Sequence, residues 1–202
     1  MAFYSDFVLP RLCDLAMRNR QLLPYRKRVV GSARGRVLEI GAGSGLNLPF
    51  YGSVREILAL EPVPRLIAMA RRATSATVPV TFIEGSAEAI PLEDGTVDTV
   101  VTTWTLCSIP DADVALHEMR RVLRPGGRLV FVEHGLATEE NVRRWQDRLT
   151  PLWRRVSGGC HLNRPIRAMI EGSGFRLERL ETGYLPGPKM LNFTHEGSAV
   201  PT

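Results

Sequence analysis

Short apolar runs alternate with amphipathic segments along most of the chain. From residue 36 onward, runs rich in valine, isoleucine and leucine are separated by segments whose apolar residues recur every three or four positions. This alternation predicts β-α units on a mainly parallel sheet, because neighbouring parallel strands need a helical crossover between them. The five parallel strands predicted in this way are Arg36–Ile40, Arg55–Leu60, Val78–Ile83, Val97–Thr103 and Arg128–Glu133.

Four segments have the apolar spacing of helices. They are Pro64–Ala73, Ala112–Leu123, a longer segment from Glu139 to Val156, and Pro165–Ser173. The longer segment contains Pro151, which lacks a backbone N–H and is expected to kink or split the helix. Its predicted inward face consists of Val142, Trp145, Leu149, Leu152 and Val156.

The two ends of the chain differ from this middle part. Phe175–Thr182 and Leu191–Val200 predict two strands, and the short link between them can join only antiparallel neighbours. Phe3–Asn19 predicts an amphipathic helix. The residues that it should turn inward are Phe7, Leu12, Leu15 and Ala16. The predicted fold class is therefore α/β: a Rossmann-like, doubly wound, seven-stranded, mainly parallel sheet with an antiparallel C-terminal hairpin strand.

Length and charge narrow the function classes. The 202 residues fit one domain, and no apolar run approaches the roughly 20 residues of a membrane-spanning helix. The N-terminus has no basic start followed by an apolar stretch, so we expect a cytoplasmic protein. The formal net charge is +5, but the arginines that dominate it are spread along the chain. This distribution favours a solvated surface over a nucleic-acid partner.

The three cysteines, Cys13, Cys107 and Cys160, lie far apart in the sequence. Their spacing matches neither a metal-ligand pattern nor a disulfide framework, and an odd number suits a reducing compartment. We therefore expect three free thiols and no metal site. The sequence carries no sign of the oligomeric state.

A glycine-rich loop follows the first predicted strand directly. Its glycines, Gly41, Gly43 and Gly45, permit tight backbone angles and let a ligand approach the main chain. The Gly-x-Gly-x-Gly spacing differs from the Gly-x-Gly-x-x-Gly of dinucleotide sites. Glu39 precedes the loop and could hold a cationic amino-acid group, which S-adenosylmethionine (SAM) has and NAD lacks. The alternative for Glu39 is a strand-end carboxylate that bonds the backbone.

Other candidate residues follow the next three strands. Glu61 ends the second strand, where a carboxylate can accept hydrogen bonds from both hydroxyls of a ribose; solvated surface is the alternative. Ala87 and Glu88 come after the third strand and could admit and bind an adenine ring. Thr103 and Trp104 end the fourth strand, where an acceptor should meet the cofactor, although Trp104 could instead be a packing residue.

Four ordered motifs resemble the class I SAM-dependent methyltransferases, most closely their small ubiquinone- and phospholipid-type branch. These motifs are Leu38–Gly45, Leu60–Pro62, Pro91–Asp98 and Val122–Gly127. The resemblance implies SAM as the cofactor, with Ala42 and Pro62 also at its site. It further implies one methyltransferase domain: a helical lid over 1–34, a SAM-binding core over 35–134, and acceptor-side helices with the C-terminal hairpin over 135–202.

Motifs in the second half look like those of the alkyl thiol methyltransferases of animals and their bacterial relatives. They are Thr105–Ser108, Phe131–His134, Pro151–Trp153 and Gly159–Arg164. The animal enzymes carry a hydrophobic N-terminal anchor, and no such segment is visible here. We therefore expect no transmembrane segment and at most peripheral membrane contact.

These observations predict methyl transfer from SAM to a small-molecule acceptor, with a thiol as the first candidate. The alternatives are a phospholipid or quinone-precursor acceptor, or SAM binding without catalysis. Alignment and desolvation should supply most of the catalysis, but a thiol acceptor must become a thiolate. His134, at the end of the fifth strand, and His161 are the candidate bases, unless each is a locally satisfied polar residue.

Overall fold

The computed structural model describes residues 9–73 and 78–202, and its strands form one seven-stranded sheet. The spatial order is β3-β2-β1-β4-β5-β7-β6. Strands β1 to β5 are parallel, whereas β7 lies between β5 and β6 and is antiparallel to both. The strands are β1 (Gly35–Ile40), β2 (Val54–Glu61), β3 (Val80–Glu84), β4 (Val97–Thr103), β5 (Leu123–His134), β6 (Phe175–Tyr184) and β7 (Phe193–Pro201). The predicted fold class is confirmed.

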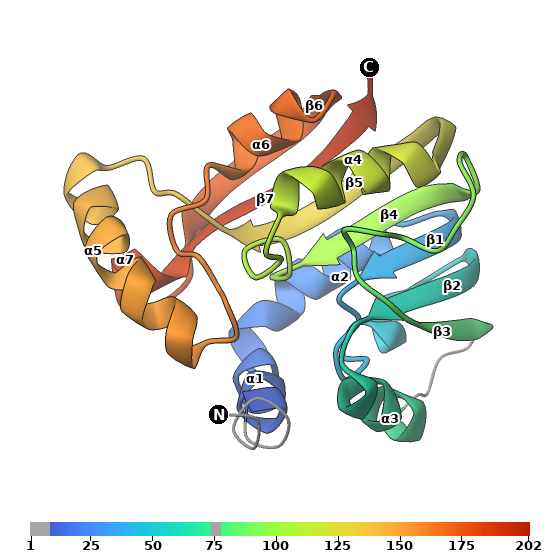
Figure 1. Cartoon of the computed structure of the whole chain (residues 1–202), viewed down its shortest axis with the longest axis horizontal. Helices are drawn as coiled ribbons and strands as arrows, with labels where there is room; N and C mark the ends of the chain where they lie inside the picture. The colour runs from blue at the N-terminus through green and yellow to red at the C-terminus, as the bar shows by residue number, and fades with distance from the viewer. Residues whose placement is uncertain (1–8, 74–77) are drawn as a thin grey trace.

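Helices cover both faces of this sheet. Side chains alternate along each strand, so Leu38 joins one hydrophobic core, packed against α4 and α6, and Val37 joins another, packed against α2. Figure 1 shows α4 and α6 together on the face turned to the viewer. The helices are α1 (Leu9–Met17), α2 (Leu23–Gly31), α3 (Pro64–Ala73), α4 (Ala112–Val122), α5 (Glu140–Val156), α6 (Ile166–Gly172) and α7 (Lys189–Asn192), with short 3-10 turns η2 (Arg20–Leu22) and η3 (Leu48–Phe50).

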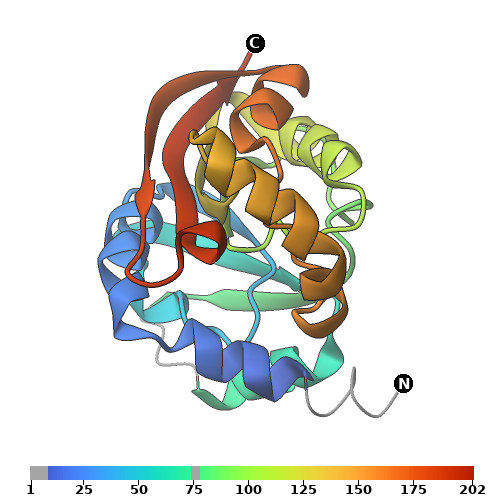
Figure 2. The same ribbon diagram turned by 90° about the vertical axis from the view of Figure 1, so that its left-hand side faces the viewer.

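Both views place α1 and α5 beyond the carboxyl ends of the parallel strands. In Figure 1, β1 and β4 point toward the side on which these two helices lie, and Figure 2 faces the molecule from that side. Ligands of open parallel sheets bind at the carboxyl ends of the strands. The arrangement therefore puts α1 and α5 next to the expected site. Within the described ranges, no helix has both the length and the apolar character needed to cross a bilayer.

The inward face predicted for the N-terminal helix is wrong. Leu12 and Leu15 have exposed fractions of 49% and 68%, and Ala16 is also exposed. Phe7 lies outside the described residues. The half-buried residues of α1 include Asp14, whose carboxylate accepts a hydrogen bond from the Ser44 hydroxyl in the glycine loop. A polar contact with the loop thus orients this helix, where the sequence pattern predicted apolar packing.

The inward face predicted for α5 is also wrong in part. Trp145, Leu152 and Val156 are 51%, 62% and 52% exposed, whereas Gln146 is only 1% exposed. The Gln146 amide donates to the Gly135 carbonyl at 3.0 Å and accepts from the Ala137 N–H at 3.0 Å. These two hydrogen bonds satisfy backbone groups of the turn after β5, which have no strand partner there. Pro151 lies inside α5 and does not split it.

We expect Gln146→Leu to destabilise the protein although leucine is the more apolar residue. The substitution leaves the Gly135 carbonyl and the Ala137 N–H buried without partners, which should lower the free energy of unfolding by about 1–3 kcal/mol. Urea denaturation measures this change. The neighbouring exposed position serves as the control: Trp145→Leu should alter it by no more than about 0.5 kcal/mol. Equal effects at both positions would contradict this account of how α5 is oriented.

Candidate functional site

A cavity of about 350 Å³ opens at the carboxyl ends of β1, β2 and β4, beneath α1. Its size is in the usual range for small-molecule sites. Most of the predicted cofactor residues line it. Those that do so are Gly41, Ala42, Gly43, Glu61, Pro62, Ala87, Thr103 and Trp104. The sequence therefore identified residues from four separate loops that the fold brings together around one cavity.

The glycine loop can follow the strand directly because its three glycines adopt backbone angles that other residues avoid. Gly41 and Gly43 have φ values of 64° and 57°. A Cβ atom on Gly41 would lie 2.4 Å from the Thr105 side chain, so this position also needs glycine for space. A Cβ on Gly43 would meet no heavy atom nearer than 3.9 Å, which leaves open space above the loop.

Glu61 fastens this loop to the end of β2. Its carboxylate accepts a hydrogen bond from the Gly43 N–H at 2.9 Å and another from the Val63 N–H at 3.0 Å. Burial raises the pKa of Glu61, and these two backbone donors oppose that rise. A carboxylate has about four lone-pair directions, so acceptor capacity remains on the side that faces the cavity.

Glu39 lies behind the cavity wall. Its carboxylate accepts hydrogen bonds from the Asn47 amide at 2.8 Å and the Tyr51 hydroxyl at 3.0 Å, and the side chain is 1% exposed. Burial raises the pKa of Glu39 to about 7, against the opposing effects of these donors and of Arg26. The Asn47 side chain also accepts from the Arg26 guanidinium at 2.5 Å. Arg26 and Asn47 both line the cavity, whereas Glu39 supports them from behind.

Two further predicted residues lie beside the cavity. Gly45 follows the lining residue Ser44 and has a φ of 80°. The carboxylate of Glu88 accepts from the Ser86 hydroxyl and the Asp111 N–H, each at 2.8 Å, so it fixes the loop after β3. Ser86 itself lines the cavity.

Trp104 has a strained backbone and an unpaired indole. Its φ of 50° is the only positive value at a non-glycine position in the described part of the chain. The ring lies under the Arg26 guanidinium, 5.3 Å from its centroid, and the buried indole N–H has no hydrogen-bond partner. Strain and an unsatisfied donor in a cavity wall are features of functional positions.

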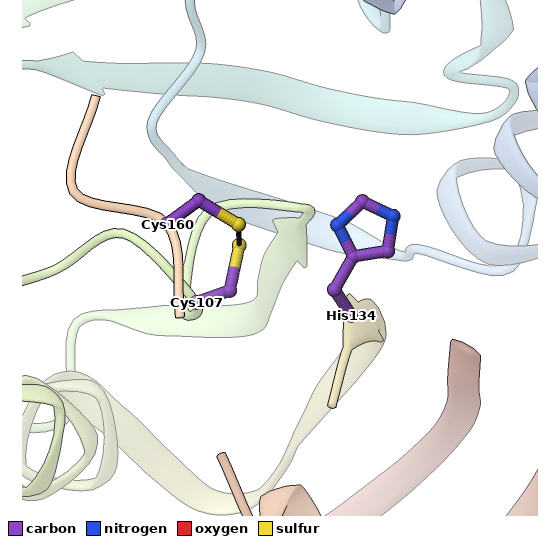
Figure 3. A group of neighbouring side chains, drawn as sticks. All are labelled: Cys107, His134 and Cys160. Carbon is purple, nitrogen blue, oxygen red and sulfur yellow. Dashed lines mark hydrogen bonds between the residues drawn. The ribbon is translucent and has the colours of Figure 1, made fainter. Parts of the chain in front are cut away.

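The predicted base His134 ends β5, and the fold places it beside Cys107, which follows β4, and Cys160, which follows α5. Figure 3 shows the Cys107 and Cys160 sulfur atoms facing each other, with the His134 ring beside them. The two sulfur atoms are 3.4 Å apart. Their hydrogen bond and the His134 ring lower the pKa of the Cys160 thiol, while the same hydrogen bond raises that of Cys107. His161 is not a member of this group. Its ring contacts the backbone of Cys107, with Nδ1 3.1 Å from the carbonyl oxygen, and burial lowers the pKa of His161.

Neither His134 nor His161 lines the cavity, but two serines close to Cys107 and Cys160 do. Ser108, next to Cys107, and Ser157, three residues before Cys160, are both lining residues. Cys13 of α1 lines the cavity as well, and its pKa is raised by burial and, to a smaller extent, by charge at Cys160. The cysteine–histidine group therefore adjoins the cavity on the side of β4 and β5.

Sequence reasoning missed the lining residues Asp14, Met17, Arg26, Asn47 and Ser157. All but Asn47 belong to segments outside the recognised motifs, and their positions depend on how the first helices and the end of α5 fold over the sheet. Asn47 lies two residues after Gly45, so its closeness to the glycine loop in the sequence was the signal that could have found it.

Comparisons with known proteins agree with this geometry. Residues 38–131 match the family model described as "Methyltransferase domain". The human thiol S-methyltransferase TMT1A is 30% identical over 175 residues, which cover 83% of this chain and 71% of the human protein. Demethylmenaquinone methyltransferase of Thermus thermophilus is 35% identical over 119 residues, 55% of this chain and 54% of that protein. A chain in a complex with the Haloferax volcanii Trm112 methyltransferase activator superposes with a TM-score of 0.72 at 19% identity, covering 99% of this chain and 96% of that one.

We expect Glu39 to make the ligand-free protein less stable as the pH rises. Because burial raises its folded-state pKa from 4.5 to about 7, its stabilising contribution is complete below the unfolded-state pKa and is lost as the pH rises through the folded-state value. Relative to the unmodified protein, Glu39→Gln should therefore gain roughly 1–3 kcal/mol in free energy of unfolding between pH 5 and pH 8.

Chemical denaturation across this pH range, without ligand, measures the difference. Glu84→Gln, at the exposed end of β3, is the matched control and should show no such trend. A constant difference between Glu39→Gln and the unmodified protein would contradict the assignment of a raised pKa to Glu39.

Proposed function

Because this chain belongs to the class I SAM-dependent methyltransferases, we propose that its cavity binds SAM and that its methyl acceptor is a small thiol. One observation carries the choice of a thiol: thiol S-methyltransferases match 81–83% of this chain at 30–33% identity, a larger share than the 76% matched by a malonyl-[acyl-carrier protein] O-methyltransferase and the 55% matched by the demethylmenaquinone methyltransferase. A match of that extent includes the acceptor side of the molecule, where Cys107, His134 and Cys160 lie.

The residues of the cavity suit the parts of SAM. The free acceptor capacity of Glu61 suits the ribose hydroxyls, and Ala87 with Glu88 adjoins the place for adenine. The buried Arg26 guanidinium suits the carboxylate of the methionine part, and Glu39, through its electrostatic field, suits the ammonium group. The open space above Gly43 allows close approach to the main chain. When bound, SAM supplies a methyl group that its sulfonium makes reactive.

The chain contributes alignment, exclusion of water and removal of a proton. Asp14 and Met17 of helix α1 line the cavity, so this helix covers it. That position supports the proposed role of residues 1–34 as a lid on one methyltransferase domain. Thr103 and Trp104 hold the end of β4 between the cofactor side and the acceptor side. The thiol proton leaves at the edge formed by Cys107, His134 and Cys160, and His134 is better placed there than His161.

A lipid or quinone-precursor acceptor is the second candidate, and the surface of α5 favours it. Trp145, Leu152 and Val156 are more than half exposed on a helix whose other exposed positions include five arginines. Apolar residues among arginines suit an anionic membrane surface. This candidate implies peripheral membrane contact. We place the protein in the cytoplasm, because its three cysteines are unpaired.

The decisive assay measures S-adenosylhomocysteine release from SAM with alkyl and aryl thiols, sulfide, phenols, a quinone precursor and phosphatidylethanolamine vesicles. We expect turnover with thiols in the absence of lipid. Turnover only with the quinone precursor or vesicles would overturn the thiol assignment in favour of the second candidate. SAM binding without turnover on any acceptor would instead indicate a non-catalytic SAM-binding protein.

Glu61→Gln tests the cofactor site in the same assay. It weakens the hydrogen bonds to ribose and places an amide against the backbone donors, so we expect the Kd for SAM to rise roughly 10- to 100-fold. Isothermal titration calorimetry measures this Kd. Glu178→Gln, on the exposed edge strand β6, should leave it unchanged. An unaltered Kd in Glu61→Gln would show that the cofactor binds elsewhere.

A further inference from the structure

Three potential metal ligands converge at the acceptor edge of the cavity. Cys107 lies after β4, His134 ends β5, and Cys160 follows α5, so three separate elements bring them together. One ligand atom from each residue lies within 4.8 Å of the other two, and the two sulfur atoms are 3.4 Å apart (Figure 3). Both cysteines are buried.

These separations fit a tetrahedral zinc ion. With Zn–S bonds of about 2.3 Å and Zn–N bonds of about 2.0 Å, neighbouring ligand atoms of a tetrahedron lie about 3.4–3.8 Å apart. Only small side-chain rotations are needed to reach that geometry from the observed separations. Two sulfur ligands and one imidazole favour zinc over the hard cations magnesium and calcium. We propose that Cys107, His134 and Cys160 bind a zinc ion at the acceptor edge.

The surroundings support two metal-bound thiolates. The Ser108 hydroxyl lies 3.6 Å from the Cys107 sulfur. The buried Trp153 indole is close enough to interact with the Cys160 thiol, and its N–H has no hydrogen-bond partner among the described residues. The Arg164 guanidinium is 8% exposed and donates to the carbonyls of Leu106 and Ile109, which fixes a positive charge next to the group. Such outer contacts orient ligands and tune a metal site.

The ligand set leaves one coordination position for a substrate. Structural zinc sites have four protein ligands, whereas catalytic sites have three and an open fourth position. Within residues 9–73 and 78–202, the group contains three ligands, and Cys13 is not among them. Ser108 follows Cys107, Ser157 comes three residues before Cys160, and both serines line the cavity, so we infer that the open position faces the place of the acceptor.

This inference rests on the proposed function and gives it a route to the thiolate. An acceptor thiol that takes the fourth position loses its proton to solvent and binds zinc as a thiolate. Its sulfur then forms a bond to the methyl carbon as the bond from that carbon to the sulfonium sulfur breaks. The products are a thioether, S-adenosylhomocysteine and one proton. In this proposal His134 is a zinc ligand and not the base that its position in the sequence predicted. Cys107 and Cys160 are zinc ligands as well, which replaces the expectation of three free thiols and no metal site.

Metal binding can be tested independently of methyl transfer. The protein is purified under reducing conditions and stripped of metal with a chelator. Zinc is then restored to one sample, and cobalt(II) is added to a second. We expect about one zinc per chain, and for cobalt the thiolate-to-metal charge-transfer absorption and the intense visible bands of a tetrahedral site. Zinc should also slow alkylation of Cys107 and Cys160 at least tenfold in the unmodified chain.

Variants identify the ligands. Cys160→Ser and His134→Gln should each weaken zinc binding at least tenfold, while His117→Gln, at an exposed position outside the group, should bind zinc as the unmodified protein does. Circular dichroism and the Kd for SAM confirm that each variant is folded. A chain that binds neither metal while both cysteines are reduced would overturn the proposal, as would a Cys107–Cys160 disulfide in protein purified under reducing conditions.

The assay with thiols separates the two proposals. Metal binding without turnover of thiols would preserve the zinc site and overturn the thiol acceptor. Undiminished turnover of thiols by metal-free protein would preserve the proposed function and overturn the role of zinc. We expect thiol turnover to fall at least tenfold on removal of zinc and to return when zinc is restored.

Discussion

The carboxylate of Glu61 holds together the two strand ends on which the cavity depends. β1 and β2 are neighbours in the sheet, and the turn after each strand has one backbone N–H, at Gly43 or Val63, that donates to the Glu61 carboxylate. These two hydrogen bonds fix the glycine loop relative to β2. The left-handed backbone of Gly41 and Gly43 allows this contact, because it turns the loop back over the strand. The other residues that line the cavity lie around this link.

The cavity wall and the layer behind it contain charged side chains that are almost fully buried. Glu39 and Glu61 are 1% and 5% exposed, and burial raises the pKa of each. Arg26, 3% exposed, is held by Asn47 and by the Met17 carbonyl, and it packs over the strained Trp104. In the proposed function, a ligand with complementary charges offsets these costs when it binds. Stability and the proposed cofactor binding would then oppose each other at Glu39.

Local patterns predicted the sheet and many of the residues that line the cavity. Strands β1, β2, β4 and β5 are largely buried, so their apolar runs are clear, and the glycine loop and Glu61 are tied to strand ends by short sequence distances. The faces of α1 and α5 were not predictable in this way. Their orientations follow from single polar contacts, Asp14 with Ser44 and Gln146 with the turn after β5, which override the apolar pattern. Cys107 and Cys160 are 53 residues apart, and only the folded chain shows that they meet.

In the proposed function, cofactor binding and acceptor binding belong to different halves of the sheet. The ends of β1 and β2 carry the residues suited to SAM, and the ends of β4 and β5 carry the group suited to an acceptor thiol. A crystal structure with S-adenosylhomocysteine bound tests this division most directly. The account predicts that both ribose hydroxyls lie within hydrogen-bond distance of Glu61, with the thioether sulfur pointing toward the end of β4. A ligand whose ribose lies away from Glu61, or whose sulfur faces away from that edge, would contradict it.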